Sequence, residues 1–155
     1  MLALKDLIQS HEWCLLTFHD DFEDETFVFQ IRFIRFDEIN FDDVDDFDEV
    51  EDVDVNQNLH ILAFEIVNLN KKKYDSDALK EKLVIVDEEG YQYNFVEDSH
   101  LCSYSEYAKR NNLSTLYSVK LPPKIPRAAA LIYELPEFFE TLYLSAEDGS
   151  LEIVN

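Results

Sequence analysis

The chain is poor in the residues that interrupt or loosen a folded backbone, with two glycines and four prolines among 155 residues. Linkers rich in these residues are therefore excluded, and the length suits one domain, residues 1–155, with its own core. The sequence also lacks a glycine-rich phosphate loop and a nucleophile elbow. Because no catalytic arrangement stands out, we expect a protein that is not an enzyme and that uses no cofactor or metal.

Cysteine is equally scarce, since Cys14 and Cys102 are the two in the chain and neither belongs to a CxxC pair. This favours two free thiols, with a single disulfide as the alternative in an oxidising compartment. His100 lies two residues before Cys102, which could begin a zinc site or a Cys–His pair. With no further ligand in view, coincidence is the favoured interpretation.

Long apolar runs are missing as well. No stretch approaches the roughly 18 apolar residues that a helix needs to cross a bilayer. The first residues, MLALKDLIQSHEWCLL, lack the basic start and small-residue cleavage site of a secretory signal. We therefore expect a cytoplasmic protein without a membrane partner.

Positive charge is the scarcest property of all. Thirteen Lys and Arg residues face 34 Asp and Glu residues, for a net charge of −21. Residues 37–54 hold eleven acids and no base, and the remainder, with 23 acids against 13 bases, is still at −10. Such a field repels nucleic acid and anionic membranes and attracts basic proteins. We expect a basic protein partner and no direct binding of nucleic acid.

Aromatic residues, in contrast, are abundant: twelve Phe, eight Tyr and one Trp favour strands and a packed interior. A short helix is predicted over residues 2–12, where Leu4, Leu7, Ile8 and His11 share a face. Alternation of apolar and polar residues predicts the strands, with a bulge after Phe33 and a loop at 70–77. The strands are expected at 13–19, 26–36, 59–69, 82–95 (two strands around a Glu-Gly turn), 115–121, 128–135 and 141–154 (a hairpin on Asp148-Gly149). The absence of strand–helix alternation indicates an antiparallel β-sandwich.

The order of signals from Leu59 onward resembles a family of small immunoglobulin-like bacterial domains of unknown function, which are often found on secreted lipoproteins. The matching features are a strand that ends in Asn68, an apolar strand that runs into an acid–Gly turn, a proline corner and two closing strands. They read LHILAFEIVN, LVIVDEEGYQY, LPPKIP, AAALIYELP and TLYLSAE. The resemblance covers roughly residues 26–147 and implies an all-β, immunoglobulin-like antiparallel sandwich, to which the sequence adds a short N-terminal helix and an acidic loop insertion.

That insertion, residues 37–58, contains the run FDDVDDFDEVEDVDV, in which an apolar residue recurs at every third position from Phe41. On a helix this spacing drifts by about 60° per repeat, and Val and Asp are weak helix formers. A solvated, mobile loop is one interpretation. A second is a docking segment that orders on a basic partner. A third, calcium binding, lacks the glycine that an EF-hand loop needs at its sixth position.

Our leading functional hypothesis is a protein–protein interaction module that binds a basic partner through this segment, assisted by an acidic turn at 20–25. Phe41 and Phe47 would be the buried anchors. The alternative is an acidic inhibitor, a nucleic-acid mimic or immunity-type protein that blocks a basic nucleic-acid-binding protein or toxin. The predicted partner-binding residues are Phe41, Asp42, Asp43, Val44, Asp45, Asp46, Phe47, Asp48, Glu49, Val50, Glu51 and Asp52.

Overall fold

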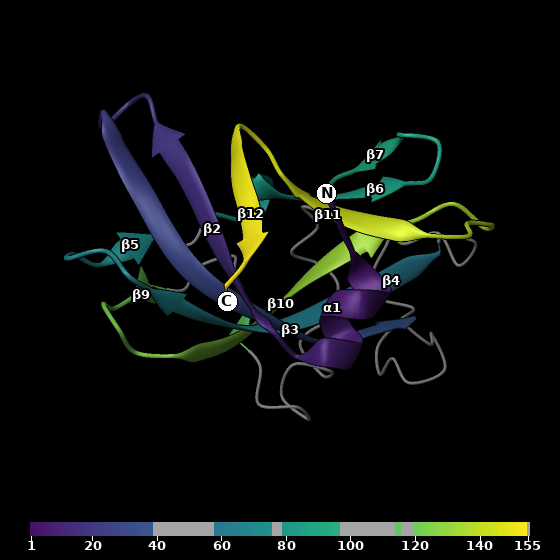
Figure 1. Ribbon diagram of the computed structural model, residues 1–155, viewed down its shortest axis with the longest axis horizontal. Helices are drawn as coiled ribbons and strands as arrows, with labels where there is room; N and C mark the ends of the chain where they lie inside the picture. The colour runs from purple at the N-terminus through teal and green to yellow at the C-terminus, as the bar shows by residue number, and fades with distance from the viewer. Residues whose placement is uncertain (39–57, 76–78, 97–113, 116–119, 155) are drawn as a thin grey trace, which may run out of the picture.

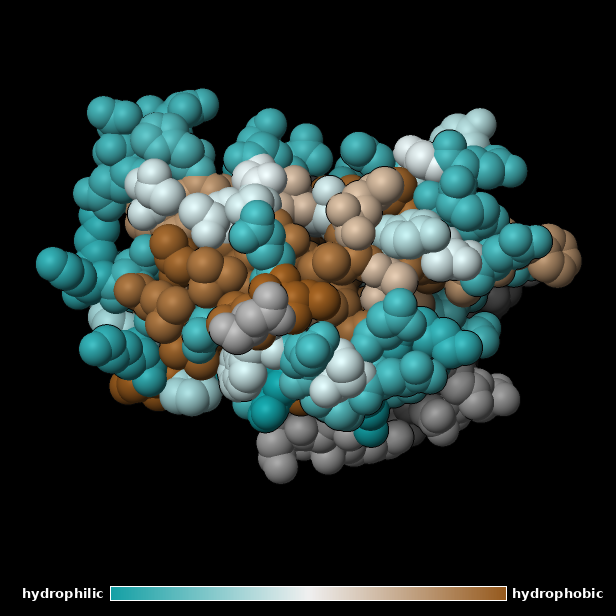
Figure 2. Space-filling model, in the orientation of Figure 1, coloured by the Kyte–Doolittle hydropathy of each residue, from teal (hydrophilic) through white to brown (hydrophobic). Residues whose placement is uncertain are grey.

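In the described part of the computed structural model, two mainly antiparallel sheets pack with a short α-helix, and a separate strand pair and a 3-10 turn at Lys80–Lys82 complete the architecture (Figure 1). The structure describes residues 1–38, 58–75, 79–96, 114–115 and 120–154. The prediction of an all-β sandwich with a short N-terminal helix is confirmed. Apolar side chains gather in the middle of the face seen in Figure 2, whereas hydrophilic side chains dominate both ends.

The larger sheet has six strands in the order β12-β2-β3-β4-β10-β8. Its neighbours are antiparallel except β8, which runs parallel to β10 over two residues. The strand bounds are β2 Trp13–Asp20, β3 Glu25–Glu38, β4 Leu59–Asn68, β8 Ser114–Thr115, β10 Arg127–Glu134 and β12 Gly149–Ile153.

The smaller sheet has four strands in the order β1-β11-β6-β7, and a separate pair joins β5 to β9. The two sheets are linked through Tyr133 of β10, whose buried hydroxyl donates a hydrogen bond of 2.9 Å to the Leu83 carbonyl of β6. The strand bounds are β1 Leu2–Ala3, β5 Tyr74–Asp75, β6 Leu83–Asp87, β7 Gln92–Tyr93, β9 Lys120–Leu121 and β11 Leu142–Ala146.

The alternating side chains of β3 supply much of the core, as their spacing predicts. Phe27, Phe29, Ile31 and Phe33 are all buried. The predicted bulge is also confirmed, because the register with β4 shifts between Phe33 and Arg35. The strand then continues to Glu38, two residues beyond the predicted end.

The expected loop at 70–77 contains a strand that the pattern did not predict. Tyr74 of β5 packs its ring against Phe27 and Phe29, with centroids 4.5 Å and 5.1 Å away. Burial of this one ring against the core holds two residues in pairing with β9, and a two-residue strand is too short to show alternation. Burial raises the pKa of Tyr74 to about 12, with a further contribution from nearby carboxylates.

The predicted hairpin at 141–154 is wrong, although both of its strands exist. β11 pairs with β1 and β6 in the smaller sheet, whereas β12 pairs with β2 in the larger one. The turn at Glu147 and Asp148, just before Gly149, therefore carries the chain from one sheet to the other. A hairpin within one sheet and a crossing between two sheets show the same alternation and the same turn residues. These local signals predict that the chain turns, but they do not determine which strand the next segment pairs with.

The helix α1, Leu4–Ser10, buries Leu4 and Leu7 as predicted. His11 does not share that face: it is exposed and ends the helix in a left-handed conformation at φ 52°. Its backbone N–H donates to the Leu7 carbonyl at 3.1 Å. In β2, Cys14 is a free, buried thiol, and burial together with the charge of Glu12 raises its pKa to about 11.

Several predictions fall partly or wholly outside the described residues. The strand expected at 115–121 is described at its two ends, as β8 and β9, and these belong to different sheets. The segment around His100 and Cys102 lies outside the described part.

Candidate protein-binding surface

All twelve predicted partner-binding residues, Phe41 to Asp52, lie outside the described residues, but both flanks of the insertion are described. The chain leaves β3 at Glu38 and returns through Asn58 into β4, where Glu38 pairs with His60. The insertion therefore begins and ends at one end of the larger sheet. Asp37 and Glu38, which we assigned to the insertion, belong instead to β3, because the bulge lets the strand pair further with β4.

Asn58 joins the returning chain to the loop that precedes β11. Its side-chain amide donates to the Pro136 carbonyl at 2.9 Å, and its own carbonyl accepts from the Leu135 N–H at 2.9 Å. The loop thus lies next to the point where the insertion re-enters the fold. Within it, Phe138 is 85% exposed.

Glu88, in the turn after β6, is tied to the same loop. Its two carboxylate oxygens accept from the backbone N–H groups of Glu140 and Thr141, each at 3.3 Å. Hydrogen bonds from its own N–H and from these two groups outweigh desolvation and lower the pKa of Glu88, so it stays ionised. The carboxylate is held in place and still faces solvent.

Asp87 fixes the shape of the turn that presents Glu88. This buried carboxylate accepts hydrogen bonds from the backbone N–H groups of Glu89 and Tyr91 and from the Tyr93 hydroxyl, all within 3.0 Å. Burial opposes its ionisation, but these bonds together lower the pKa of Asp87. The turn leaves Tyr91 64% exposed beside Glu88 and Glu89.

We call this region the acidic end: Asp37, Glu38, Asn58, residues 87–91 and residues 134–141. In Figure 1 it lies on the right, where the β6–β7 turn, the loop before β11 and the junction of β3 with β4 come together. The chain has no Lys or Arg in residues 36–70, 83–108 or 128–155, and these segments supply the whole acidic end. Arg35, next to it on β3, pairs with Asp37 at 3.3 Å.

A hollow of about 460 Å³ lies within the acidic end. It is bordered by three carboxylates and two phenylalanine rings: Glu88, Glu137, Phe138, Phe139 and Glu140. Carboxylates next to exposed aromatic rings are suited to binding cationic groups. Among the described residues, no group of three or more His, Cys, Asp or Glu is arranged to hold a metal ion.

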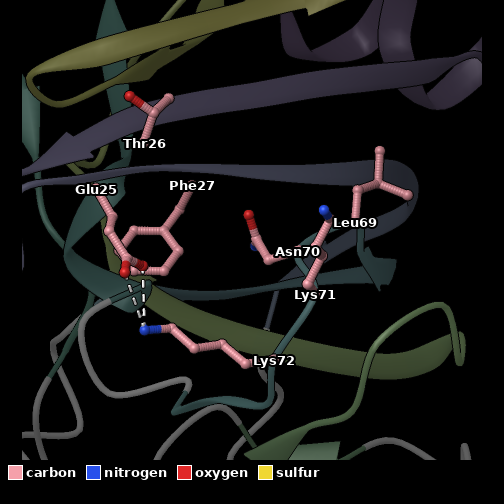
Figure 3. Close-up of a pocket in the computed structure, with 7 residues that line it drawn as sticks. All are labelled: Glu25, Thr26, Phe27, Leu69, Asn70, Lys71 and Lys72. Carbon is pink, nitrogen blue, oxygen red and sulfur yellow. Dashed lines mark hydrogen bonds and ion pairs between the residues drawn. The ribbon is translucent and has the colours of Figure 1, made fainter.

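The opposite end of the larger sheet has a different electrostatic character (Figure 3). Lys72 contacts the Glu25 carboxylate at 3.1 Å, and both residues line a pocket of about 480 Å³. Lys72 also contacts the Glu23 carboxylate at 3.6 Å. The Asn70 side chain in this pocket is already engaged, since it exchanges hydrogen bonds of 3.0 Å and 3.1 Å with the backbone of Val28. Lys71 and Lys73 flank Lys72 in sequence, so this end is electrostatically mixed.

The acidic turn at 20–25, which we expected to act with the insertion, lies at this mixed end. It precedes β3, whereas the insertion follows it, and the 14 residues of β3 separate the two by roughly 40 Å. The structure therefore does not bring the turn and the flanks of the insertion together. The residues that the structure brings together near those flanks are Glu88, Phe138 and Glu140.

His60 packs against two aromatic side chains next to the acidic end. Its ring stacks on Phe36 with centroids 4.9 Å apart and contacts Phe139 edge-on at 6.1 Å. Nδ1 is buried, and it has no hydrogen-bond partner in the structure as described. Burial lowers the pKa of His60, although the charges of Glu38 and Asp37 oppose this shift.

We expect His60 to make stability depend on pH. In the unfolded chain a histidine binds a proton near pH ~6.5, whereas the folded protein resists protonation of His60. The unfolded state therefore binds more protons just below that pH, and the free energy of unfolding falls as pH drops toward the folded-state pKa. Urea unfolding of His60→Gln between pH ~7.5 and ~5.5 is expected to show a smaller decrease than the unmodified protein. The exposed His19→Gln is the control, and equal decreases in all three proteins would refute this role.

The sequence interpretation missed Phe138 and Glu88. A usable signal existed in PEFFE at 136–140, where two phenylalanines lie between acids directly after a proline that closes a strand. Glu88 could not be linked to this loop from the sequence, because 52 residues separate it from Glu140. The contact depends on the pairing of β6 with β11.

Comparisons with known proteins support the fold. No model of a protein family matches the chain, and no curated protein sequence is detectably similar to it. A secreted Mycobacterium tuberculosis protein, MPT63, has a similar structure with a TM-score of 0.52 at 8% identity, over 90% of this chain and 92% of its own. A conserved hypothetical protein from Bacillus anthracis gives 0.51 at 13% identity, over 93% and 98%.

The class that fold and surface define is an antiparallel β-sandwich with one acidic, aromatic end. At these identities the two solved structures support the sandwich alone. The immunoglobulin-like lipoprotein family suggested by the sequence pattern is not matched. Within the described residues, no helix is long and apolar enough to span a membrane.

Proposed function

We propose that this protein is a non-enzymatic interaction module that binds a basic protein partner through the acidic segment Phe41–Asp52. The observation that carries this proposal is the position of the segment's flanks. Glu38 and Asn58 emerge at an end of the sandwich built from chain segments without Lys or Arg. Segment and surface would therefore attract the same basic partner.

The acids and the apolar residues of the segment would have separate roles. Eleven acids between residues 37 and 54 raise the rate of encounter with a basic protein and set the preference for it. Phe41 and Phe47 then supply apolar area to bury, because aromatic side chains are frequent anchors of interfaces. The charge raises the association rate, and burial of the two rings lowers the dissociation rate.

The test begins with affinity capture from native lysate at low and high salt, comparing the intact chain with a chain lacking residues 41–55. The captured partner is then purified and its Kd measured. We expect Phe41→Ala with Phe47→Ala to weaken binding by about 30-fold, as for two moderate anchors, and the deletion, which also removes the acids, to weaken it by more than that. Binding that is insensitive to salt, or that survives the double substitution, would refute the proposal.

A second candidate is an acidic inhibitor that occupies the nucleic-acid site of a basic protein or neutralises a basic toxin. It is favoured by one observation: the Glu88 carboxylate is held by two backbone N–H groups on an ordered surface. A mimic of a phosphate backbone needs carboxylates at fixed positions. Competition with duplex DNA for the captured partner separates the two candidates, since an inhibitor of this kind displaces DNA and an interaction module need not.

The cytoplasmic location and the immunoglobulin-like family remain parts of the proposal. The similar mycobacterial structure is described as that of a secreted protein, and this description applies to that protein. Cell fractionation of the native source, with detection of the chain in each fraction, tests the location directly.

A further inference from the structure

We propose that the hollow at the acidic end binds the side chain of an arginine from a basic polypeptide. The inference rests on the proposed function for the charge of the partner, and it adds the residue type that is recognised and the place where it binds. The hollow lies on the sandwich itself, at residues separate from the segment 41–52.

The lining of the hollow combines the two groups that an arginine side chain needs. Glu88, Glu137 and Glu140 supply carboxylates, and Phe138 and Phe139 supply ring faces. A guanidinium can stack on a ring with its plane while its N–H groups donate to carboxylates at its edge. Lysine offers a compact, strongly hydrated charge that cannot do both, so the hollow should prefer arginine.

The exposure of Phe138 supports a binding role over a packing role. At 85% exposure it contributes little to the core, while the next residue, Phe139, packs against His60. A single exposed phenylalanine is common on protein surfaces. Phe138 is distinguished by its position, because it borders a hollow together with Phe139 and three carboxylates. Its neighbours here are acidic, so the complementary group is cationic.

Other occupants fit the described residues less well. An anion would meet three carboxylates, with no Lys or Arg in the segments that form the hollow. A metal ion would need a set of converging ligands, and the described residues contain none. The ionised state of Glu88 is maintained by backbone hydrogen bonds, which favours a charged, hydrogen-bonding cation.

The experiment uses two peptides of equal length and charge, one alternating arginine with serine and one alternating lysine with serine. Titration calorimetry gives their Kd values for the intact chain and for Phe138→Ala. We expect the arginine peptide to bind about fivefold more tightly than the lysine peptide, and Phe138→Ala to remove this preference. Phe22→Ala is the matched control, because Phe22 is 98% exposed in the acidic turn at the opposite end.

A second variant, Glu137→Gln with Glu140→Gln, removes charge without removing the ring. It should weaken both peptides and leave a reduced arginine preference. Equal binding of the two peptides by the intact chain, or an arginine preference that survives Phe138→Ala or is lost in Phe22→Ala, would overturn the inference.

The chain lacking residues 41–55 separates this inference from the proposed function. If the deletion abolishes binding while Phe138→Ala has no effect, the hollow is not a site and the segment is. If the deletion has no effect while Phe138→Ala removes the arginine preference, the hollow is the site and the segment is not. Loss in both variants supports both. An intact chain that binds neither peptide overturns the arginine site alone, because the proposed function is tested by the captured protein partner.

Discussion

Gly149→Ala is expected to lower the free energy of unfolding by about 3 kcal/mol, a large effect for the addition of one methyl group. A Cβ at this position would lie 2.3 Å from the Thr17 carbonyl oxygen and 2.9 Å from the Cβ of Phe18. The carbonyl belongs to the backbone of β2, which cannot rotate away. Gly149 is also paired with Phe18, so relief of the clash would break the start of β12.

Gly90→Ala is the matched control for this substitution. Gly90 has a φ of 94°, so an alanine there is strained, but no atom lies within 4 Å of the added Cβ. We expect a cost of about 1 kcal/mol from the backbone alone. Urea unfolding followed by tryptophan fluorescence compares the two variants, and equal costs would show that β12 does not pack against β2 as closely as described.

Asn68→Leu is expected to cost about 4 kcal/mol, because it removes four hydrogen bonds from a buried side chain of similar size. The Asn68 amide donates to the carbonyls of Leu121 at 2.7 Å and Lys72 at 3.0 Å. Its oxygen accepts from the backbone and side-chain N–H groups of Asn70, both at 2.8 Å. Leucine would remove all four bonds at a position where Asn68 is fully buried, although the Asn70 side chain would keep its other bonds, those to the backbone of Val28.

The loss should be concentrated at the mixed end, where Asn68 connects β4, the turn after it and β9. We therefore expect faster proteolysis near residues 70–75 in Asn68→Leu than in the unmodified protein. Asn94→Leu, at an exposed position, serves as the control. A cost below about 1 kcal/mol, equal to that of the control, would show that the hydrogen bonds contribute little.

The strands that the sequence predicted well are those in which alternation runs over many residues. In β3 the period of two runs from Phe27 to Phe33, and the structure buries every second side chain as expected. Asn68 was noticed as the end of a strand in a family pattern, and the structure supplies its physical reason in four buried hydrogen bonds.

The failures have a common cause, which is that periodicity defines the face of a side chain but not the partner of a strand. The turn at Asp148 and Gly149 is compatible with a hairpin and with a crossing between sheets. In the same way, the acidic turn at 20–25 is close to the insertion in sequence, yet β3 carries them to opposite ends. Tyr74 was missed because one buried ring produces no pattern.

The sequence predicted the negative charge of the candidate surface, but it did not predict which residues form that surface. The run at 37–54 is evident from the sequence, and its flanks are at the acidic end. Glu88 and Phe138, however, come from turns that follow β6 and precede β11, and the register Leu142 to Asp87 brings them together. That register depends on pairing between segments far apart in sequence, which local patterns do not encode.

The most direct test of the central claim, that the acidic end is the binding surface, is an NMR titration of the ¹⁵N-labelled chain with the arginine–serine peptide. Backbone amide shifts are expected to change at Glu38, Asn58, Glu88 and residues 137–141. They should stay unchanged at Phe22 and at Lys71–Lys73, at the mixed end. Shifts that are largest around the turn at 20–25, or that are spread evenly over the sandwich, would contradict the account.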